Sequence, residues 1–328
     1  MPRRIPLVIG HRGASGYRPE HSRAAYELAL EMGVDAVEPD VVATRDGVLV
    51  IRHENEISGT TDVADHPEFA DRRTTKRVDG VSLTGWFTED FTWAELSTLR
   101  CRERLPRLRP ENAAFDGAEP ILRLSDLLDL VRDGARRLGR RIGIVLEVKH
   151  ATYFQSVGID LAPLIEEDLR AGGWAQGEHP LIVESFESTV LGRLRERGIA
   201  ASFVYLIEAE GGPFDLVAAL GRAAPTYRET VGPAGLDRLV GAVDGISVDK
   251  SLLLARGSRI AGDAHERGLT VFTWTCRPEN AFLSPPFRGS GGRASFGDYE
   301  GEWAVIADAG VDGVFVDHPD LGAAFFRG

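Results

Sequence analysis

The sequence predicts an α/β fold, a (β/α)₈ barrel of the TIM type. Short runs of β-branched and other apolar residues recur along the chain, and helical patterns, often closed by glycine, separate most of them. Several runs are continuously apolar, as is typical of parallel strands that helices cover. An α/β barrel uses about 250 residues or more as one domain. The 328 residues, 1–328, are therefore expected to form a single barrel domain.

The expected elements follow one another in a regular order. We expect strands at 7–11, 36–42, 48–53, 143–149, 181–186, 202–207, 245–249, 270–275 and 312–317. We expect helices at 23–32, 123–138, 160–171, 187–197, 251–267 and 301–309. Ser22 is expected to cap the first helix, because a serine hydroxyl can accept a hydrogen bond from a free N–H of the first turn.

These strands are one more than a barrel needs, and one link is too short for a crossover helix. Residues 43–47 separate the second run from the third and contain a turn signal centred on Asp46. We therefore expect an antiparallel hairpin in which position 53 lies opposite about position 39. That register would place His53 beside Glu38 and Asp40.

Two segments interrupt the strand–helix rhythm. Residues from about 54 to 120 are polar and rich in Thr, Asp and Arg, and they are interpreted as an insertion that covers the barrel mouth. The arginines between 100 and 109 are interpreted as a solvated face of this insertion rather than as a phosphate site. A second irregular segment, about 277–300, is rich in Pro, Gly and Ser and is expected to be a loop at the same end.

Composition excludes several classes of protein. A net charge of −12 argues against a nucleic-acid binder, which needs clustered Lys and Arg. Cys101 and Cys276 are too few for a disulfide framework or a Cys-rich zinc site. No apolar run approaches the ~20 residues of a transmembrane helix. No secretory leader precedes residue 7, so the chain as written is expected to be cytoplasmic.

The candidate chemistry begins with carboxylates on strands. Glu38 and Asp40 are two residues apart, so on a strand their side chains share one face, and Glu147 and Lys149 repeat this spacing. The alternatives are a solvent-exposed strand for the first pair and a structural ion pair for the second. Buried carboxylates need compensation, and three of them without Cys suit one hard divalent cation, Ca²⁺ or Mg²⁺.

Two histidines end predicted strands close to these carboxylates. His11, followed by Arg12, ends the first strand, and His53 ends the third. Imidazole titrates near neutral pH, so a pair of histidines can act as base and acid. The histidines without a comparable setting are assigned structural roles; they are His66, His150, His179, His265 and His318.

Several motifs follow one another in a characteristic order along the chain: His11-Arg12-Gly13-Ala14-Ser15, Pro19-Glu20-His21-Ser22, Glu38-Pro39-Asp40, Arg45-Asp46-Gly47 with Val50-Ile51-Arg52-His53, Glu147-Val148-Lys149, and the segments 85–92, 274–280 and 311–320. This ordered set resembles the glycerophosphodiester phosphodiesterase family, in its longer bacterial type. Together the motifs span nearly the whole chain. One motif departs from the family, because the usual Pro-Glu-Asn-Thr is here Pro-Glu-His-Ser.

The resemblance implies a metal-dependent enzyme that hydrolyses glycerophosphodiesters to glycerol 3-phosphate and an alcohol. By position, Glu38, Asp40 and Glu147 match metal ligands, and His11 and His53 match the acid–base pair. The residues expected near the phosphate or substrate are Arg12, Lys149, Glu20, Trp274 and Phe186. Trp274 and Phe186 could equally be core residues.

Several alternatives stay open at this point. A related diesterase could act on lysophospholipids or on a glycerophosphate polymer such as teichoic acid, and a barrel without activity could bind glycerophosphodiesters as a sensor. The nucleophile could be water or the glycerol 2-hydroxyl. Headgroup preference and oligomeric state are not determined by the sequence, and the expected partner is a small molecule.

Overall fold

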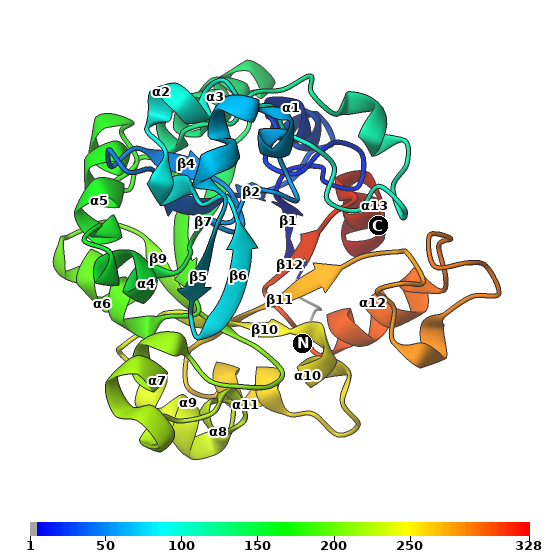
Figure 1. The fold of residues 1–328 in the computed structure, drawn as a ribbon. Helices are drawn as coiled ribbons and strands as arrows, with labels where there is room; N and C mark the ends of the chain where they lie inside the picture. Colours follow the sequence, from blue (N-terminus) through cyan, green and yellow to red (C-terminus); the bar gives the residue numbers. More distant parts are fainter. Residues whose placement is uncertain (1–4) are drawn as a thin grey trace.

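The computed structural model describes residues 5–328 and contains a closed barrel of eight parallel strands (Figure 1). The strands are β1 (Leu7–His11), β2 (Ala36–Glu38), β7 (Gly143–Val148), β8 (Leu181–Ser185), β9 (Ser202–Ile207), β10 (Gly245–Asp249), β11 (Thr270–Cys276) and β12 (Gly313–Val316). They follow one another around the ring in the order β2-β1-β12-β11-β10-β9-β8-β7, and pairing between β2 and β7 closes it. The predicted barrel is confirmed.

Helices surround this barrel on the outside (Figure 1). The longer ones are α1 (Arg23–Glu31), α3 (Leu124–Leu138), α5 (Leu161–Ala171), α6 (Ser188–Glu196), α12 (Tyr299–Asp308) and α13 (Pro319–Arg327). The shorter ones are α2 (Trp93–Leu96), α4 (Ala151–Ser156), α7 (Phe214–Leu220), α8 (Tyr227–Thr230), α9 (Pro233–Leu239), α10 (Lys250–Leu254) and α11 (Ile260–His265). Among the described residues no helix is both long enough and apolar enough to cross a bilayer. Ser22 caps α1 as expected, because its side chain accepts a hydrogen bond from the Ala25 N–H.

Two predicted elements are divided. The helix expected at 251–267 is two helices, α10 and α11, with a break that contains Gly257 at a φ of 74°. The strand expected at 36–42 is split at Pro39 into β2 and β3 (Asp40–Ala43), because proline has no N–H for the ladder. The second half then pairs in parallel with β7, with Asp40 opposite Glu147.

The expected hairpin is present. β3 pairs with β4 (Leu49–Ile51) in antiparallel register, with Val41 opposite Ile51 and Ala43 opposite Leu49. Continued by two residues, this register places position 53 opposite position 39, as the sequence predicts. His53 therefore ends the hairpin at the carboxyl ends of β2 and β7.

The barrel interior is filled in two layers that follow from the alternation of side chains along each strand. The lower layer is apolar and consists of Ile9, Ala36, Val145, Val204, Phe272 and Phe315, with Ile182 and Trp274 packed against it. On β1, β2 and β7 the next residue facing inward is His11, Glu38 or Glu147, two positions further on. The polar side chains consequently share one level, at the carboxyl end of the barrel. Strand residues that face outward from the barrel pack against the helices and form a larger hydrophobic core.

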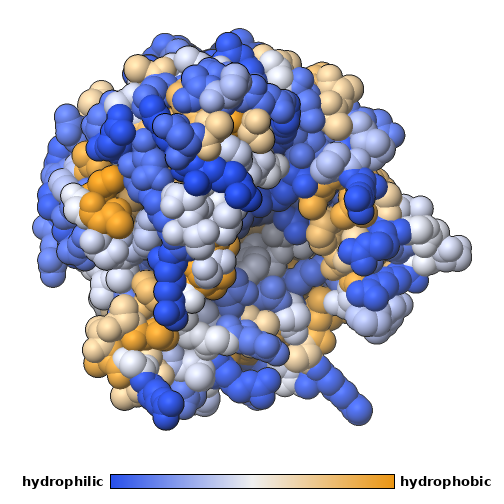
Figure 2. Space-filling model, viewed as in Figure 1, coloured by the Kyte–Doolittle hydropathy of each residue, from blue (hydrophilic) through white to orange (hydrophobic). Residues whose placement is uncertain are grey.

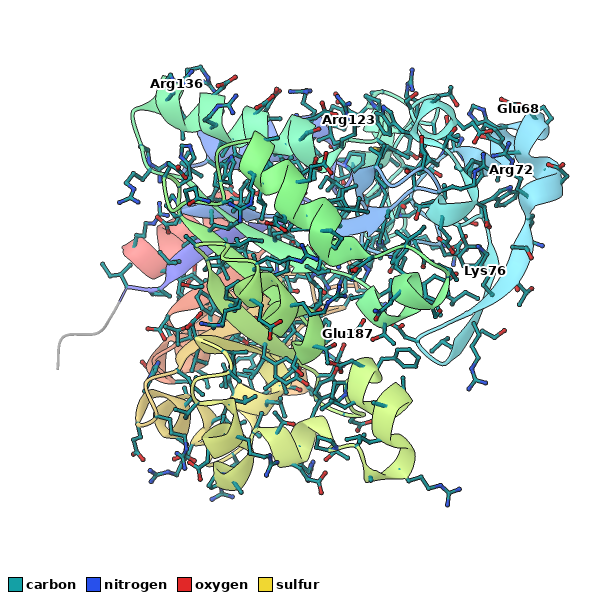
Figure 3. The ribbon with its side chains drawn as sticks, turned by 90° about the vertical axis from the view of Figure 1, so that its left-hand side faces the viewer. Glu68, Arg72, Lys76, Arg123, Arg136 and Glu187 are labelled. Atoms are coloured by element: carbon teal, nitrogen blue, oxygen red, sulfur yellow. The ribbon has the colours of Figure 1, made fainter. Side chains whose placement is uncertain are left out.

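The segment 54–120 has secondary structure of its own. It contains the antiparallel hairpin of β5 (Thr74–Val78) and β6 (Val81–Gly85), helix α2, and the 3₁₀ helices η1 (Val63–Asp65), η2 (Pro67–Arg72), η3 (Thr88–Asp90) and η4 (Asn112–Phe115). The hairpin stands over the barrel mouth in Figures 1 and 3. Lys76 on the hairpin binds Glu89 and Asp90, with Nζ to oxygen distances of 2.9 and 2.7 Å. Elsewhere the chain forms η5 (Gly221–Ala223), and η6 (Pro285–Phe287) lies in the expected loop at 277–300.

Candidate active site

A cavity of about 1030 Å³ opens at the carboxyl ends of the strands. Figure 2 shows this hollow at the barrel mouth, with hydrophilic residues along much of its rim. Eight of the residues proposed from the sequence line it, and these are His11, Arg12, Glu38, His53, Glu147, Lys149, Phe186 and Trp274. Asp40 and Glu20 lie behind this wall and are buried. The structure thus brings together side chains that lie far apart in the sequence, from His11 on β1 to Trp274 on β11.

Three buried glutamates form an acidic cluster in the cavity. Glu38, Glu147 and Glu184 each offer one carboxylate oxygen, and these oxygens all lie within 4.8 Å of one another. Glu38 Oε1 and Glu184 Oε2 have no hydrogen-bond partner among the described residues. Burial, together with the neighbouring carboxylates, raises the pKa of Glu38 and of Glu184 well above the usual range. The same causes raise the pKa of Glu147 to about 8, against the charge of Lys149.

This cluster has the donors that a hard divalent cation requires. Its atoms are carboxylate oxygens, and two of them lack a protein partner although burying an unpaired carboxylate is costly. A cation among them would stabilise the ionised form of all three groups. Glu184 was not identified from the sequence. The signal was available, because Glu184 follows the interior residue Ile182 by two positions and lies opposite Glu147 in the β7–β8 register.

Asp40 lies beside the cluster but already has several protein partners. One oxygen, Oδ2, is 2.8 Å from Nε2 of His21 and 3.4 Å from Nε of Arg12, and the other is 3.1 Å from Nζ of Lys149. Burial would raise the pKa of Asp40, but the charge of Lys149 and these contacts hold it well below the usual range. His21, the departure from the family motif, is itself fully buried, and its Nδ1 is 2.7 Å from the Tyr26 hydroxyl. Asp40 is therefore ionised and fixed in place by its neighbours.

Both candidate histidines are oriented by a carboxylate. His11 Nδ1 is 2.7 Å from Asp317 Oδ1, and His53 Nδ1 is 2.5 Å from Glu54 Oε1. The Nε2 atom of each ring makes no hydrogen bond with the described residues, so it is the nitrogen available to the cavity. Burial, then the positive charge of Arg12, lowers the pKa of His11 to about 4 and that of His53 to about 3. Both rings are therefore neutral near pH 7.

Arginines of the insertion bind the two carboxylates that orient the histidines. Arg104 lies 2.7 Å from Glu54 Oε2, and Arg109 lies 2.6 Å from Asp317 Oδ2. The interpretation of the 100–109 arginines as a solvated face is therefore wrong for these two, while Arg107 is exposed as expected. The physical reason is the unbalanced charge of buried carboxylates at the mouth, which recruits cations. These pairings could not be predicted from the sequence, because the partners are 50 and 208 residues away.

The remaining predicted residues divide into two groups. Glu20 binds Arg12, with its Oε2 2.9 Å from Nη1, and it also binds Arg104, so it holds Arg12 from behind the cavity wall. Phe186 and Trp274 line the cavity with their rings in an edge-to-face arrangement, 5.7 Å apart. Nζ of Lys149 is 5.5 Å from the centre of the Phe186 ring. The aromatic rings of the cavity wall therefore lie next to the positively charged Lys149.

Comparison with known proteins gives one consistent result. Residues 11–321 match the glycerophosphoryl diester phosphodiesterase family. A glycerophosphodiester phosphodiesterase of Arabidopsis thaliana is 31% identical over 336 residues, covering 95% of this chain and 83% of the relative. One of Haemophilus influenzae is 23% identical, covering 98% of this chain and 90% of its own. An Oleispira antarctica phosphodiesterase, solved with the product sn-glycerol-3-phosphate, has a TM-score of 0.65 at 20% identity, covering 99% of this chain and 98% of that one.

The ion pairs of Arg109 give a testable expectation for stability. Arg109→Ala should lower the free energy of unfolding by about 3–5 kcal/mol, because it leaves Glu279 and Asp317 buried without this cation. The measurement is urea unfolding followed by circular dichroism. Arg107→Ala, at an exposed position of the same segment, is the matched control and should stay within about 0.5 kcal/mol of wild type. Equal stability of the two variants would show that the buried ion pairs do not hold the insertion in place.

Proposed function

Because this chain belongs to the glycerophosphoryl diester phosphodiesterase family, we propose that it hydrolyses glycerophosphodiesters to glycerol 3-phosphate and an alcohol with the help of one divalent cation. The observation that carries the proposal is the meeting of an acidic cluster, two neutral histidines and two cations in one cavity. The complex of the Oleispira antarctica phosphodiesterase with sn-glycerol-3-phosphate supports the choice of product.

We assign the cation to Glu38, Glu147 and Glu184, with Asp40 adjoining. When bound, a divalent cation polarises the phosphoryl group and stabilises the negative charge that develops on its oxygens. All the donors are carboxylate oxygens, which favours Ca²⁺ or Mg²⁺ over Zn²⁺. The unpartnered oxygens of Glu38 and Glu184 support this assignment.

Arg12 and Lys149 hold the phosphodiester. Arg12 is positioned by Glu20, and its backbone N–H donates to Glu38 Oε2 at 2.9 Å. Arg12 is therefore held next to the acidic cluster. Lys149 is tied to the same cluster, with Nζ 2.5 Å from Glu147 Oε1. Their charges offset the charge of the substrate and of the transition state, at positions fixed before the substrate arrives.

His11 and His53 divide the proton transfers. Each ring is neutral and held through Nδ1, so Nε2 can take a proton from the nucleophile or, once protonated, give it to the departing alkoxide. The carboxylates of Asp317 and Glu54 stabilise the imidazolium that forms for a moment in such a cycle. The nucleophile is water or the substrate's own glycerol 2-hydroxyl, and a cyclic glycerophosphate, visible by phosphorus NMR, would indicate the second.

Removal of metal tests the cation. Chelation should abolish turnover of glycerophosphocholine, glycerophosphoethanolamine and glycerophosphoglycerol, because the negative charge that develops on the phosphoryl oxygens would then lack the divalent cation. Ca²⁺ or Mg²⁺ should restore turnover better than Zn²⁺. Release of glycerol 3-phosphate, followed by phosphorus NMR, is the readout. Undiminished turnover by the chelator-treated, metal-free protein would contradict the proposal.

Substitution of the histidines tests the acid–base pair. His11→Ala and His53→Ala should each lower kcat by roughly 10²–10⁴-fold, the usual contribution of a positioned acid or base. Metal affinity should stay near that of wild type, whereas Glu38→Ala, Glu147→Ala and Glu184→Ala should lose it. Calorimetric titration with Ca²⁺ separates the two classes of variant.

A change of leaving group then assigns the two roles. A p-nitrophenyl diester needs little protonation on departure, so the variant that lacks the general acid should recover much of its rate on it. The variant that lacks the base should not recover. Wild-type turnover of a natural glycerophosphodiester by either histidine variant would show that the ring is not part of the acid–base pair.

A further inference from the structure

We propose that the cavity beside the phosphoryl position is a binding site for a cationic headgroup, so that the preferred substrates are glycerophosphodiesters of amino or quaternary ammonium alcohols. This inference rests on the proposed function, because it names the alcohol that the same site accepts. It is carried by a buried carboxylate with one unpartnered oxygen, by aromatic rings that line the same cavity, and by further carboxylates of the cavity wall that form no ion pair.

The carboxylate is Glu187, at the carboxyl end of β8. It lines the cavity, although only 3% of its surface is exposed. One oxygen, Oε2, accepts a hydrogen bond of 2.9 Å from the backbone N–H of Thr152, and Oε1 has no partner among the described residues. No Lys or Arg in the described part of the chain forms an ion pair with Glu187. An unpaired carboxylate in such a place is costly unless a ligand compensates it.

A second acidic group reaches the cavity from the insertion. Asp79, in the turn of the β5–β6 hairpin, binds His150 with Oδ2 2.6 Å from Nδ1, while its Oδ1 is buried without a partner. Burial, and then the neighbouring Asp79, raises the pKa of Glu187 to about 7. The two carboxylates are therefore close enough to repel one another. Figure 3 shows Glu187 on the barrel side of the hairpin.

Aromatic rings complete this side of the cavity. The Phe186 ring lies edge-to-face with Tyr227 at 6.3 Å and with Trp274 at 5.7 Å, and all three residues line the cavity. The faces of such rings attract ammonium groups. Trp274 uses its Nε1 for Ser247 O at 3.3 Å, so its ring contributes a surface rather than a hydrogen-bond donor. A carboxylate with aromatic faces beside it is suited to a compact organic cation.

The cavity wall carries charges of both signs. Of the cations that line it, Arg277 and Lys250 form ion pairs with Asp317 and Glu302, and Arg288 donates to the backbone oxygen of Leu283. Glu208 and Asp249 also line the cavity, and neither forms an ion pair with a described residue. The wall therefore offers further carboxylates to a cationic ligand.

The contact between Lys149 and Phe186 suits a short amino alcohol. Phe186 contacts Lys149 on one side, with 5.5 Å between Nζ and the ring centre, and immediately precedes Glu187. In choline and ethanolamine a short ethylene group joins the nitrogen to the phosphate oxygen. A phosphate at Lys149 would therefore bring the nitrogen close to the Phe186 ring. A neutral glycerol headgroup would leave the charge of Glu187 uncompensated.

Kinetic selectivity tests this site. The ratio of kcat/KM for glycerophosphocholine to that for glycerophosphoglycerol should be about tenfold or more in the metal-loaded wild type, as for other cation–aromatic and ion-pair contacts away from water. Glu187→Gln should reduce the ratio to near one, because it removes the charge and keeps the shape. Glu196→Gln makes the same change at an exposed position of α6 and should keep the wild-type ratio.

A binding measurement separates this inference from the proposed function. Phosphocholine should bind to wild type about tenfold more tightly than inorganic phosphate in calorimetric titrations, and Glu187→Gln should abolish the difference. If Glu187→Gln does not fold, as judged by circular dichroism, Tyr227→Leu replaces it and should also reduce the difference.

The outcomes are distinct. If no diester is hydrolysed, the proposed function fails, and the calorimetric difference still decides the headgroup site. If diesters are hydrolysed with a ratio near one in wild type, or with a ratio that Glu187→Gln leaves unchanged, the headgroup site is contradicted and the proposed function stands.

Discussion

The structure depends on the burial of several carboxylates at one end of a parallel barrel. Glu38, Asp40, Glu147 and Glu184 all lie within the mouth with little exposed surface. Carboxylates in such surroundings must be paired, protonated or bound to a metal. Asp40 is paired with Lys149, His21 and Arg12, Glu147 shares Lys149 with it, and Glu38, Glu147 and Glu184 face one another. The need to compensate this charge explains why cations gather at the mouth and why the acidic cluster fits a divalent ion.

The insertion is part of the same charge arrangement. Arg104 binds Glu54, and Arg109 binds Asp317. These two carboxylates in turn contact the Nδ1 atoms of His53 and His11. A continuous chain of charged contacts thus connects a segment outside the barrel to the rings that face the substrate. The histidines are fixed by the barrel, by the insertion and by the last strand together. A segment that only covered the mouth would not need these contacts.

The part of the site that follows a strand pattern could be predicted from the sequence, and the part that depends on distant partners could not. Alternation along a strand placed Glu38 and Glu147 on the inner face, and the short link after residue 42 brought His53 back to them. Glu184 obeys the same alternation and was missed only because a single acidic residue in an apolar run carries no motif. Arg104 and Arg109 differ from their exposed neighbour Arg107 in nothing that the local sequence shows. Their positions are decided by carboxylates that are near only in the folded chain.

Calorimetric titration of Ca²⁺ into the chelator-treated protein, compared with Glu184→Gln, tests this account most directly. If the buried carboxylates form one metal centre, the wild type should bind one Ca²⁺ per chain, and Glu184→Gln should bind it about tenfold or more weakly, because an anionic oxygen of the cluster is lost. No binding by the wild type, or equal affinity of the two proteins, would contradict it.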